Sequence, residues 1–401
     1  MENRLQIDFK MNMSLRILWV SEVVPDPNSG AGGTELQMVR QLRLLGHDVT
    51  TIWEDQIPRR IRHGNLHYAL ELPKAYARVI AAAVRKETFD VVTVNLGQSF
   101  QAARMLRKQN FPGVFIVRSH GLDDHLDVVL AQWRKKLGLP PRPWLKEVLG
   151  KRLTCILHGH MAKAARVCDG YVVSNSLDAR WLNATHGLAE EKIAVVPQAP
   201  AMAFCRTPAP LMTNSRLKRI LYVANFHFAK GPRDVAQCVE AVLAAHPDVE
   251  MTWICRPDDH EQVRNLFSAR LPDRVRLIGW MPQDQLVEQF DQHGIFLYPS
   301  LFDGFGKVFL EAMSRGMCVV GTHAGGMVDL LRHRENGLVC DFNSSSQMML
   351  AVEDLLKNPS MAVQFSESAV NTASQYTWER AGKSLESFFR RRLEAASVTA
   401  R

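Results

Sequence analysis

Short apolar runs that suit β-strands alternate with longer amphipathic runs that suit helices, and this order recurs in both halves of the 401-residue chain. The expected strands are 16–20, 49–53, 91–95, 114–118 and 171–174 in the first half, and 219–223, 249–254, 276–278, 295–298 and 318–320 in the second. Such alternation is typical of βαβ units and a parallel sheet. Because single cores stop growing at about 250–300 residues, the length favours two domains.

The pattern therefore predicts an α/β protein with two Rossmann-like, doubly wound parallel-sheet domains that face each other across a cleft. Residues 1–13 are expected to be a disordered leader, 14–200 the N-terminal domain and 218–375 the C-terminal domain. Segment 201–217 holds Pro208 and Pro210 with little periodicity, which predicts a linker. Residues 376–401 are expected to form a helix that crosses back to the N-terminal domain.

Neither an apolar stretch of about 20 residues nor the apolar core of a signal peptide stands out, so a cytoplasmic location is expected. The seven cysteines are scattered and include no Cys-x-x-Cys pair, which favours reduced thiols and no metal site.

The positive charge of the chain lies in its N-terminal half. Residues 1–207 carry 28 Lys and Arg against 19 Asp and Glu, a balance of +9. The remaining residues carry 21 Lys and Arg against 22 Asp and Glu, a balance of −1. Segment 131–166 alone holds nine basic residues and one acid, Glu147, with Trp133 and Trp144 among them. This composition predicts contact with an anionic membrane surface or a lipid-phosphate acceptor, with a solvated helix as the alternative. No nucleic-acid recognition motif accompanies the charge, so nucleic-acid binding is not expected.

Two turns of the N-terminal half carry candidate site residues. Gly32 and Gly33 lie in a glycine-rich stretch before an amphipathic helix, where free N–H groups can bind an anion. The alternative there is a plain tight turn. His120 directly follows the fourth strand, so we expect it at the cleft, bonded to a sugar hydroxyl or close to a phosphate.

The stretch 298–311 is the most informative part of the C-terminal half. Asp303 lies on the turn after a strand, Gly304 and Gly306 allow the backbone to approach a ligand, and Glu311 lies one turn inside the following helix. Two carboxylates can accept hydrogen bonds from vicinal hydroxyls while the helix N-terminus faces phosphate between them. The alternative is a capping Asp and a solvated Glu.

Two neighbouring turns add to this site. Gly325 and Gly326 follow the next strand, and Lys230 follows the first C-terminal strand, where its point charge suits a diphosphate.

At these residues the chain resembles glycosyltransferase family 4, whose members are retaining enzymes of the GT-B fold. The resemblance extends from the Gly-Gly-x-Glu stretch at Gly32 to Trp378. The family's Glu-x7-Glu motif stands here as Asp303-x7-Glu311, its glycine pair as Gly325 and Gly326, and its cleft histidine as His120.

The resemblance implies a role for each matched residue. His120, Lys230, Asp303 and Glu311 would be the catalytic set, with Asp303 on donor-sugar hydroxyls and Glu311 on the ribose. The implied donor-binding residues are Gly32, Gly33, Asn225, Gly304, Phe305, Gly306, Lys307, Val308, Gly325 and Gly326. Contacts to the nucleobase are expected from Arg256 and from Gly279, Trp280 and Met281. The N-terminal domain would take the acceptor.

This sequence departs from the family pattern at two positions. Asn225 stands where the family has an arginine for the diphosphate, so Lys230 keeps only part of that charge, and Arg233 or Lys307 is a candidate substitute. Asp303 is one methylene shorter than the usual glutamate.

The implied reaction is the transfer of a hexose-type sugar, with retained configuration, from a nucleotide-diphosphate sugar to a glycan or lipid-linked acceptor in polysaccharide or glycolipid synthesis. The chain holds no Asp-x-Asp pattern, so we expect no metal and no cofactor besides the donor. The alternatives are a catalytically inactive sugar-nucleotide-binding subunit and a GT-B epimerase or phosphorylase.

Overall fold

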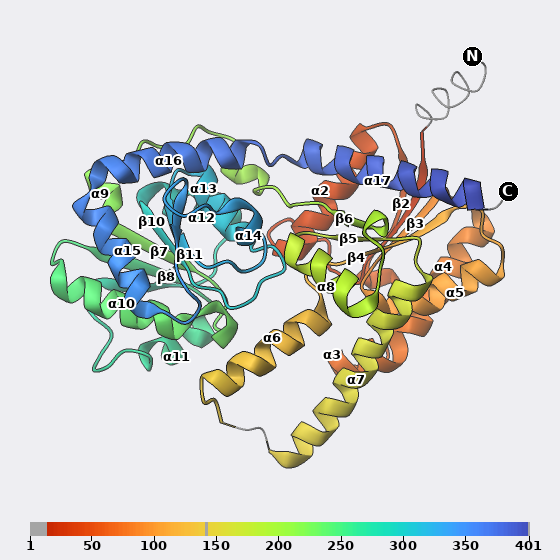
Figure 1. Ribbon diagram of the computed structural model, residues 1–401, viewed down its shortest axis with the longest axis horizontal. Helices are drawn as coiled ribbons and strands as arrows, with labels where there is room; N and C mark the ends of the chain where they lie inside the picture. The colour runs from red at the N-terminus through yellow and green to blue at the C-terminus, as the bar shows by residue number, and fades with distance from the viewer. Residues whose placement is uncertain (1–13, 141–142, 400–401) are drawn as a thin grey trace. The chain divides into compact units, whose positions relative to one another are not determined.

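The structure is a computed structural model that describes residues 14–140 and 143–399, so the predicted leader 1–13 and Arg142 lie outside the described residues. The chain forms two units, each built around its own sheet (Figure 1). Within the described residues, the first unit contains 14–128, 135–197 and 378–399, and the second contains 129–134 and 198–377.

The first unit holds a six-stranded parallel sheet in the order β2-β1-β3-β4-β5-β6. Its strands are β1 (Arg16–Val20), β2 (Asp48–Ile52), β3 (Val91–Asn95), β4 (Val114–Arg118), β5 (Gly170–Val173) and β6 (Ile193–Val195). Its helices are α2 (Gly30–Leu44), α3 (Gly64–Leu66), α4 (Leu72–Lys86), α5 (Phe100–Lys108), most of α6 (Asp123–Lys136), α7 (Trp144–Val167), α8 (Ser176–His186) and α17 (Trp378–Thr399). A π-helical turn, His67–Glu71, leads into α4.

Both faces of this sheet are buried, as the apolar runs require. Leu18 and Val20 of β1 pack into the same core cluster as Tyr76 and Ile80 of α4. On the other face, Gly170 of β5 leaves room for the ring of Phe388 in α17. The last helix of the chain therefore belongs to the core of the first unit.

The second unit holds another six-stranded parallel sheet, in the order β12-β11-β10-β7-β8-β9. Its strands are β7 (Arg219–Val223), β8 (Glu250–Ile254), β9 (Val275–Ile278), β10 (Ile295–Tyr298), β11 (Cys318–Gly321) and β12 (Gly337–Val339). Its helices are α9 (Asn214–Leu217), α10 (Pro232–Ala245), α11 (His260–Arg264), α12 (Gln283–Gln292), α13 (Lys307–Ser314), α14 (Met327–Leu330), α15 (Ser345–Lys357) and α16 (Pro359–Ser374).

Alternate residues of its central strands enter two separate cores, one on each face of the sheet. Ile295 and Leu297 of β10 pack in the cluster that contains residues of α10 and α15. Phe296 and Tyr298 pack in the cluster that contains residues of α12 and α13. The predicted fold class, with two doubly wound parallel sheets, is confirmed.

Segment 201–217, expected as a linker, packs within the second unit. Phe204 is buried there, and the buried guanidinium of Arg216 donates hydrogen bonds to the carbonyl oxygens of Pro210 and Arg315. The segment also contains a 3-10 turn, Met202–Cys205, and α9.

Candidate functional site

The core of the candidate site is a hydrogen-bonded group in the second unit made of Lys230, Asp303 and Tyr298. Nζ of Lys230 lies 2.5 Å from Oδ2 of Asp303, and the hydroxyl of Tyr298 donates a hydrogen bond to the same oxygen. No described residue donates a hydrogen bond to Oδ1 of Asp303. The structure thus brings together two residues predicted from separate motifs and adds Tyr298, which the sequence analysis did not single out.

The two turns that carry this group are packed against each other. They follow β7 and β10, which are neighbours in the sheet. A Cβ on Gly231, at φ +67°, would lie 2.4 Å from the carbonyl oxygen of Pro299, so only glycine allows this contact. The N–H of Leu301 donates to the carbonyl oxygen of Ala229 at 2.7 Å. These backbone contacts fix Lys230 beside Asp303.

The helix α13 begins directly beside Asp303. Gly306 precedes it in the left-handed region, at φ +83°, and a Cβ there would lie 3.1 Å from the ring of Tyr298. No side chain caps this helix start, so the first N–H groups of α13, from Lys307 and Val308, have no intrahelical acceptor. Such a start is suited to an anion.

Glu311 lies one turn into α13 and is buried. The N–H of Ala201 donates to its Oε1 at 3.2 Å, and Nζ of Lys307 lies 3.9 Å from the same atom. Burial raises the pKa of Glu311, and the charge of Lys307 and the Ala201 N–H oppose that rise. Its other oxygen, Oε2, accepts no hydrogen bond from the described residues.

The predicted glycine pair shapes the Asp303 turn. Gly325 has φ +54°, and a Cβ there would lie 2.8 Å from the carbonyl oxygen of Asp303. The N–H of Gly326 donates to the carbonyl oxygen of Phe305 at 2.9 Å, and the Phe305 ring is buried in the core. The N–H of Gly326 and the carbonyl oxygen of Phe305 are thus paired with each other, and the donor contacts expected of these two residues stay predictions.

The residues expected near the nucleobase lie at the ends of β8 and β9, which pair in the sheet. A Cβ on Gly279 would lie 3.2 Å from Cγ of Pro257, so the turns at Arg256 and Gly279 are adjacent. Arg256 and Trp280 are exposed, Met281 is half-buried against the core, and Asn225 is exposed at the end of β7. Their contacts with a base or diphosphate stay predictions.

In the first unit, the structure corrects the prediction for Gly32 and Gly33. Both lie inside the first turns of α2, which begins at Gly30 after the N-cap Ser29. The N–H of Gly32 donates to Oγ of Ser29 at 2.9 Å, and the N–H of Gly33 donates to its carbonyl oxygen at 3.1 Å. Neither N–H group is therefore free to bind an anion.

His120 is held by Glu35, a residue to which the sequence analysis gave no role. Nε2 of His120 lies 2.7 Å from Oε1 of the fully buried Glu35. Arg118 contacts the same oxygen at 2.5 Å, and Trp19 donates its indole N–H to Oε2 at 2.5 Å. Burial alone would raise the pKa of Glu35, but the charges of Arg118 and His120 lower it to about 2. Glu35 therefore stays ionised and fixes the imidazole.

A second group of polar residues contains Glu22, which follows β1, and Asn95, the last residue of β3, and the order of the first sheet reverses between these two strands. Glu22 accepts hydrogen bonds from the hydroxyl of Tyr76 at 2.5 Å and from the amide of Asn95 at 3.0 Å, and burial raises its pKa. Burial, together with the charges of Asp127 and Glu22, raises the pKa of Asp123 to about 6. Ligands of doubly wound sheets bind at such a reversal, so this group is a candidate acceptor contact.

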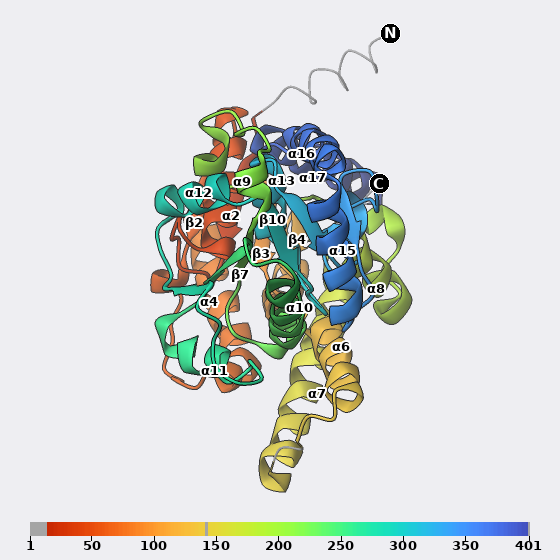
Figure 2. The same cartoon turned by 90° about the vertical axis from the view of Figure 1, so that its left-hand side faces the viewer.

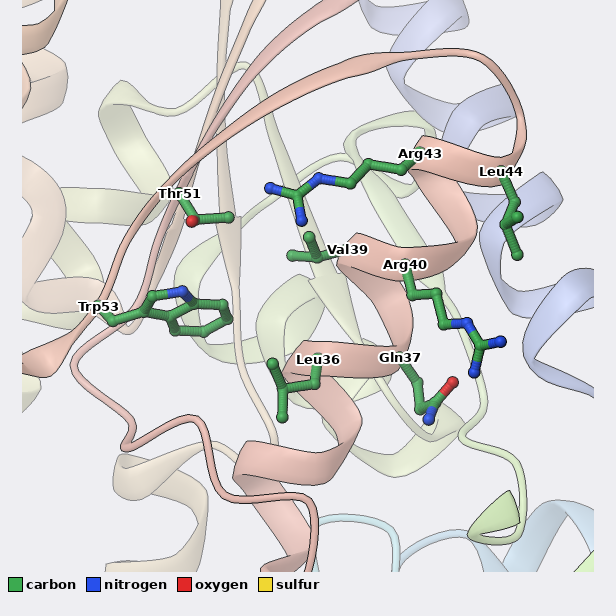
Figure 3. Close-up of a pocket in the computed structure, with 8 residues that line it drawn as sticks. All are labelled: Leu36, Gln37, Val39, Arg40, Arg43, Leu44, Thr51 and Trp53. Carbon is green, nitrogen blue, oxygen red and sulfur yellow. The ribbon is translucent and has the colours of Figure 1, made fainter.

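A surface hollow of about 450 Å³ lies elsewhere on the first unit, between α2 and β2 (Figure 3). Its lining includes Leu36, Arg40 and Trp53, and none of the predicted site residues.

The basic segment 131–166 spans the end of α6 and most of α7. The ring of Trp133 lies 5.9 Å from that of Phe342 within the second unit, so this tryptophan is packed, whereas Trp144 is exposed.

Across residues 14–140 and 143–399, no helix has the length and apolarity needed to cross a membrane. In the same residues, no three His, Cys, Asp or Glu side chains gather as metal ligands would.

The chain is similar in sequence to known glycosyltransferases. The family model of glycosyl transferases group 1 matches residues 207–372, which include Lys230, Asp303 and Glu311. The D-inositol 3-phosphate glycosyltransferase of Acidothermus cellulolyticus is 25% identical over 332 residues, which are 77% of this chain and 70% of that protein.

Two solved structures share the fold. Sucrose-phosphate synthase from Thermosynechococcus elongatus superposes with a TM-score of 0.74 at 16% identity, and the match covers 95% of this chain and 100% of the synthase chain. An Anabaena protein solved in complex with UDP superposes with a TM-score of 0.64 at 14% identity, over 96% and 100% of the two chains. The narrower resemblance to family 4 stays a prediction. The two parallel sheets and the solved structures show a GT-B fold, and the matched region and the relatives support glycosyltransferase activity.

Proposed function

We propose that the chain is a retaining glycosyltransferase that moves a hexose-type sugar from a nucleotide-diphosphate sugar to a glycan or lipid-linked acceptor. The observation that supports this most directly is the Lys230, Asp303 and Tyr298 group beside the uncapped start of α13. It combines a cation, a carboxylate and backbone donors within one small region, as a sugar diphosphate requires.

In this proposal each part of the nucleotide sugar, namely the hexose, the diphosphate and the ribose, has a partner in the protein. The hydroxyls of the transferred sugar donate to Oδ1 of Asp303, because Oδ2 is already occupied by Lys230 and Tyr298. The diphosphate lies near Nζ of Lys230 and the first N–H groups of α13. The ribose hydroxyls donate to Oε2 of Glu311, which is free of other donors among the described residues.

In the reaction, the acceptor oxygen bonds to the anomeric carbon while the bond from that carbon to the diphosphate oxygen breaks on the same face. The acceptor proton passes to the departing diphosphate oxygen, and the products are the glycoside and the nucleoside diphosphate. Lys230 stabilises the negative charge that grows on the leaving group, so the protein acts by positioning and electrostatics. We propose that this step needs no metal and no further cofactor.

The acceptor belongs to the first unit, where His120, Glu22 and Asp123 offer polar contacts. We propose that the protein works in the cytoplasm, in polysaccharide or glycolipid synthesis at the inner face of the membrane.

Thermal shifts with UDP-, GDP- and ADP-hexoses test the donor, because a ligand that binds the native state raises the melting temperature by mass action. The donor so found is then incubated with glycan and polyprenyl-phosphate acceptors, and the anomeric configuration of the product is read by NMR. Product with inverted configuration would contradict the retaining mechanism. Stabilisation by a donor without any release of nucleotide would favour an inactive binding subunit.

A further inference from the structure

The first half of α7 exposes large apolar side chains that its own unit does not cover. Trp144 is 71% exposed and Leu149 63%, with Val148 at 46% and Ile156 at 41%. Soluble surfaces expose such residues singly, but here four occur within thirteen positions of one helix. In both views this part of α7 lies away from the sheet of the first unit (Figures 1 and 2).

These residues lie on one side of the helix. At 3.6 residues per turn, positions 144, 148, 149 and 156 share a face, and the exposed Cys155 lies on it too. The residues that pack into the core from the second half of α7, Met161, Ala164 and Ala165, fall on the opposite face. The exposed apolar face is therefore not a continuation of the side that packs into the first unit.

Basic side chains surround this face. Lys146 and Lys151 flank it and Arg152 lies within it, and all three are exposed. Glu147 is the one acid of α7 before Val167 and lies 2.8 Å from Lys151. Long basic side chains can lay their stems along apolar surface while their charged ends reach anionic head groups.

We propose that the first half of α7, residues 144–156, docks on an anionic lipid bilayer. Its apolar face enters the interface, and Lys146, Lys151 and Arg152 contact acidic head groups. Tryptophan and leucine beside lysine and arginine are the composition of helices that lie in a membrane surface. This inference deepens the membrane location proposed above and rests on it for its biological role, but the binding itself needs no sugar donor.

Vesicle binding tests the proposal on the full chain. The exposed Cys155 is labelled with an environment-sensitive fluorophore after Cys205→Ser removes the other exposed thiol. Vesicles of phosphatidylcholine with phosphatidylglycerol should shift the emission to the blue and sediment the protein. Vesicles of phosphatidylcholine alone should do so weakly, and added salt should weaken the anionic binding, because screening acts over about 10 Å at 0.1 M.

The double variant Trp144→Ser with Leu149→Gln should weaken binding to anionic vesicles about tenfold or more, because it removes two inserting side chains. The matched control is Leu350→Gln, which changes an exposed leucine of α15 (58%) in the other unit and should bind as the parent does. Equal binding to neutral and anionic vesicles, or no effect of the double variant, would overturn the proposal.

A second copy of the chain is the competing partner for this face, and light scattering without lipid tests for it. A concentration-dependent dimer that the double variant abolishes would assign the face to a second copy of the chain instead. The donor-induced thermal shift is measured on the same variants. In the parent protein, no binding to anionic vesicles together with an intact donor shift would reject the membrane surface alone, whereas vesicle binding without a donor shift would reject the donor site alone.

Discussion

The carboxylate of Asp303 shows how single residues in this site depend on each other. Its Oδ2 receives hydrogen bonds from both Lys230 and Tyr298, and Gly306 keeps the space beside it open. An aspartate reaches one methylene less far than a glutamate, so the place of its carboxylate depends more closely on where the backbone puts the residue. Two donors on one oxygen fix the side chain and direct Oδ1 away from them, which is the orientation that the proposed sugar contact needs.

Lys230→Ala should lower turnover by about 10² to 10³, the range for one preorganised electrostatic donor, and should lower donor affinity less. The charge on the leaving diphosphate grows during the reaction, so the cation matters most in the transition state. Asn225→Arg in the Lys230→Ala background should restore part of the rate. Steady-state kinetics on the single and double variants measure this, with Lys357→Ala on α15 as the control. Near-normal turnover of Lys230→Ala would move the cation to Arg233 or Lys307.

Glu311→Gln should weaken nucleotide binding about tenfold, since a charged hydrogen-bond acceptor is replaced by a neutral one. The amide oxygen of glutamine can still accept the N–H of Ala201, so the native state should be retained. Glu311→Ala should weaken binding further and also lower the melting temperature, because that N–H is then left without its acceptor. Calorimetric titration with the nucleotide decides, and unchanged affinity in both variants would remove Glu311 from the ribose site.

Motif spacing predicted Lys230, Asp303 and Glu311 because each follows a strand of one parallel sheet, and such positions gather at one edge. Tyr298 and Glu35 could not be predicted in the same way. Tyr298 lies in a strand and bonds Asp303 on the turn that follows. Glu35 lies in a helix and bonds Arg118, which is distant in the sequence. Local patterns carry no information about which buried polar atoms will meet.

At the scale of elements, the central strands were predicted within one or two residues because they are continuous apolar runs between helices. The edge strands β6 and β12 were missed, since each has three residues, and β12 begins at the Asn-Gly pair of Asn336 and Gly337, which indicates a turn. The start of α2 was placed too late because glycine is a poor helix former. The Ser29 cap and the burial of Glu35 outweigh that propensity.

The start of α6 carries a carboxyl whose ionisation opposes folding. Asp123 is protonated more readily in the native state, with its pKa raised from 3.8 to about 6 by burial and then by nearby acids. A raised pKa stabilises the fold at pH values below the unfolded pKa, and this contribution is lost as the pH rises through 6. Asp123→Asn should therefore stabilise the first unit by roughly 2 kcal/mol near pH 8 and by almost nothing near pH 4.

Urea unfolding of the parent and of Asp123→Asn across that pH range measures the difference. Asp48→Asn, which changes an exposed acid at the start of β2, is the control for replacing a carboxylate by an amide. A stabilisation that is the same at both ends of the range would mean that Asp123 is ionised normally in the native state.

At the scale of the whole molecule, the chain builds most of the first unit, then the second, and returns with α17. The buried side chains Leu385, Phe388 and Phe389 of this helix pack in the first unit, and Oε1 of Glu386 lies 3.3 Å from Nε2 of His47. The first unit is thus completed by residues that follow the second unit in the sequence. The stability of the first unit should therefore depend on α17, although about 180 residues separate this helix from the rest of the unit along the chain.

Gly382 in α17 gives a sharp test of this dependence. A Cβ at this position would lie 2.6 Å from Cβ of Gln41 in α2, and neither atom can rotate away. In an isolated helix, Gly→Ala stabilises by about 1 kcal/mol, whereas overpacking costs typically about 1–3 kcal/mol. Gly382→Ala should therefore destabilise the first unit by roughly 1 kcal/mol, against its helix propensity, and leave the second unit unchanged. Calorimetry that resolves the two units measures this, with Ser384→Ala on the exposed side of the same helix as the control. A stabilised first unit in Gly382→Ala would show that α17 does not pack on α2.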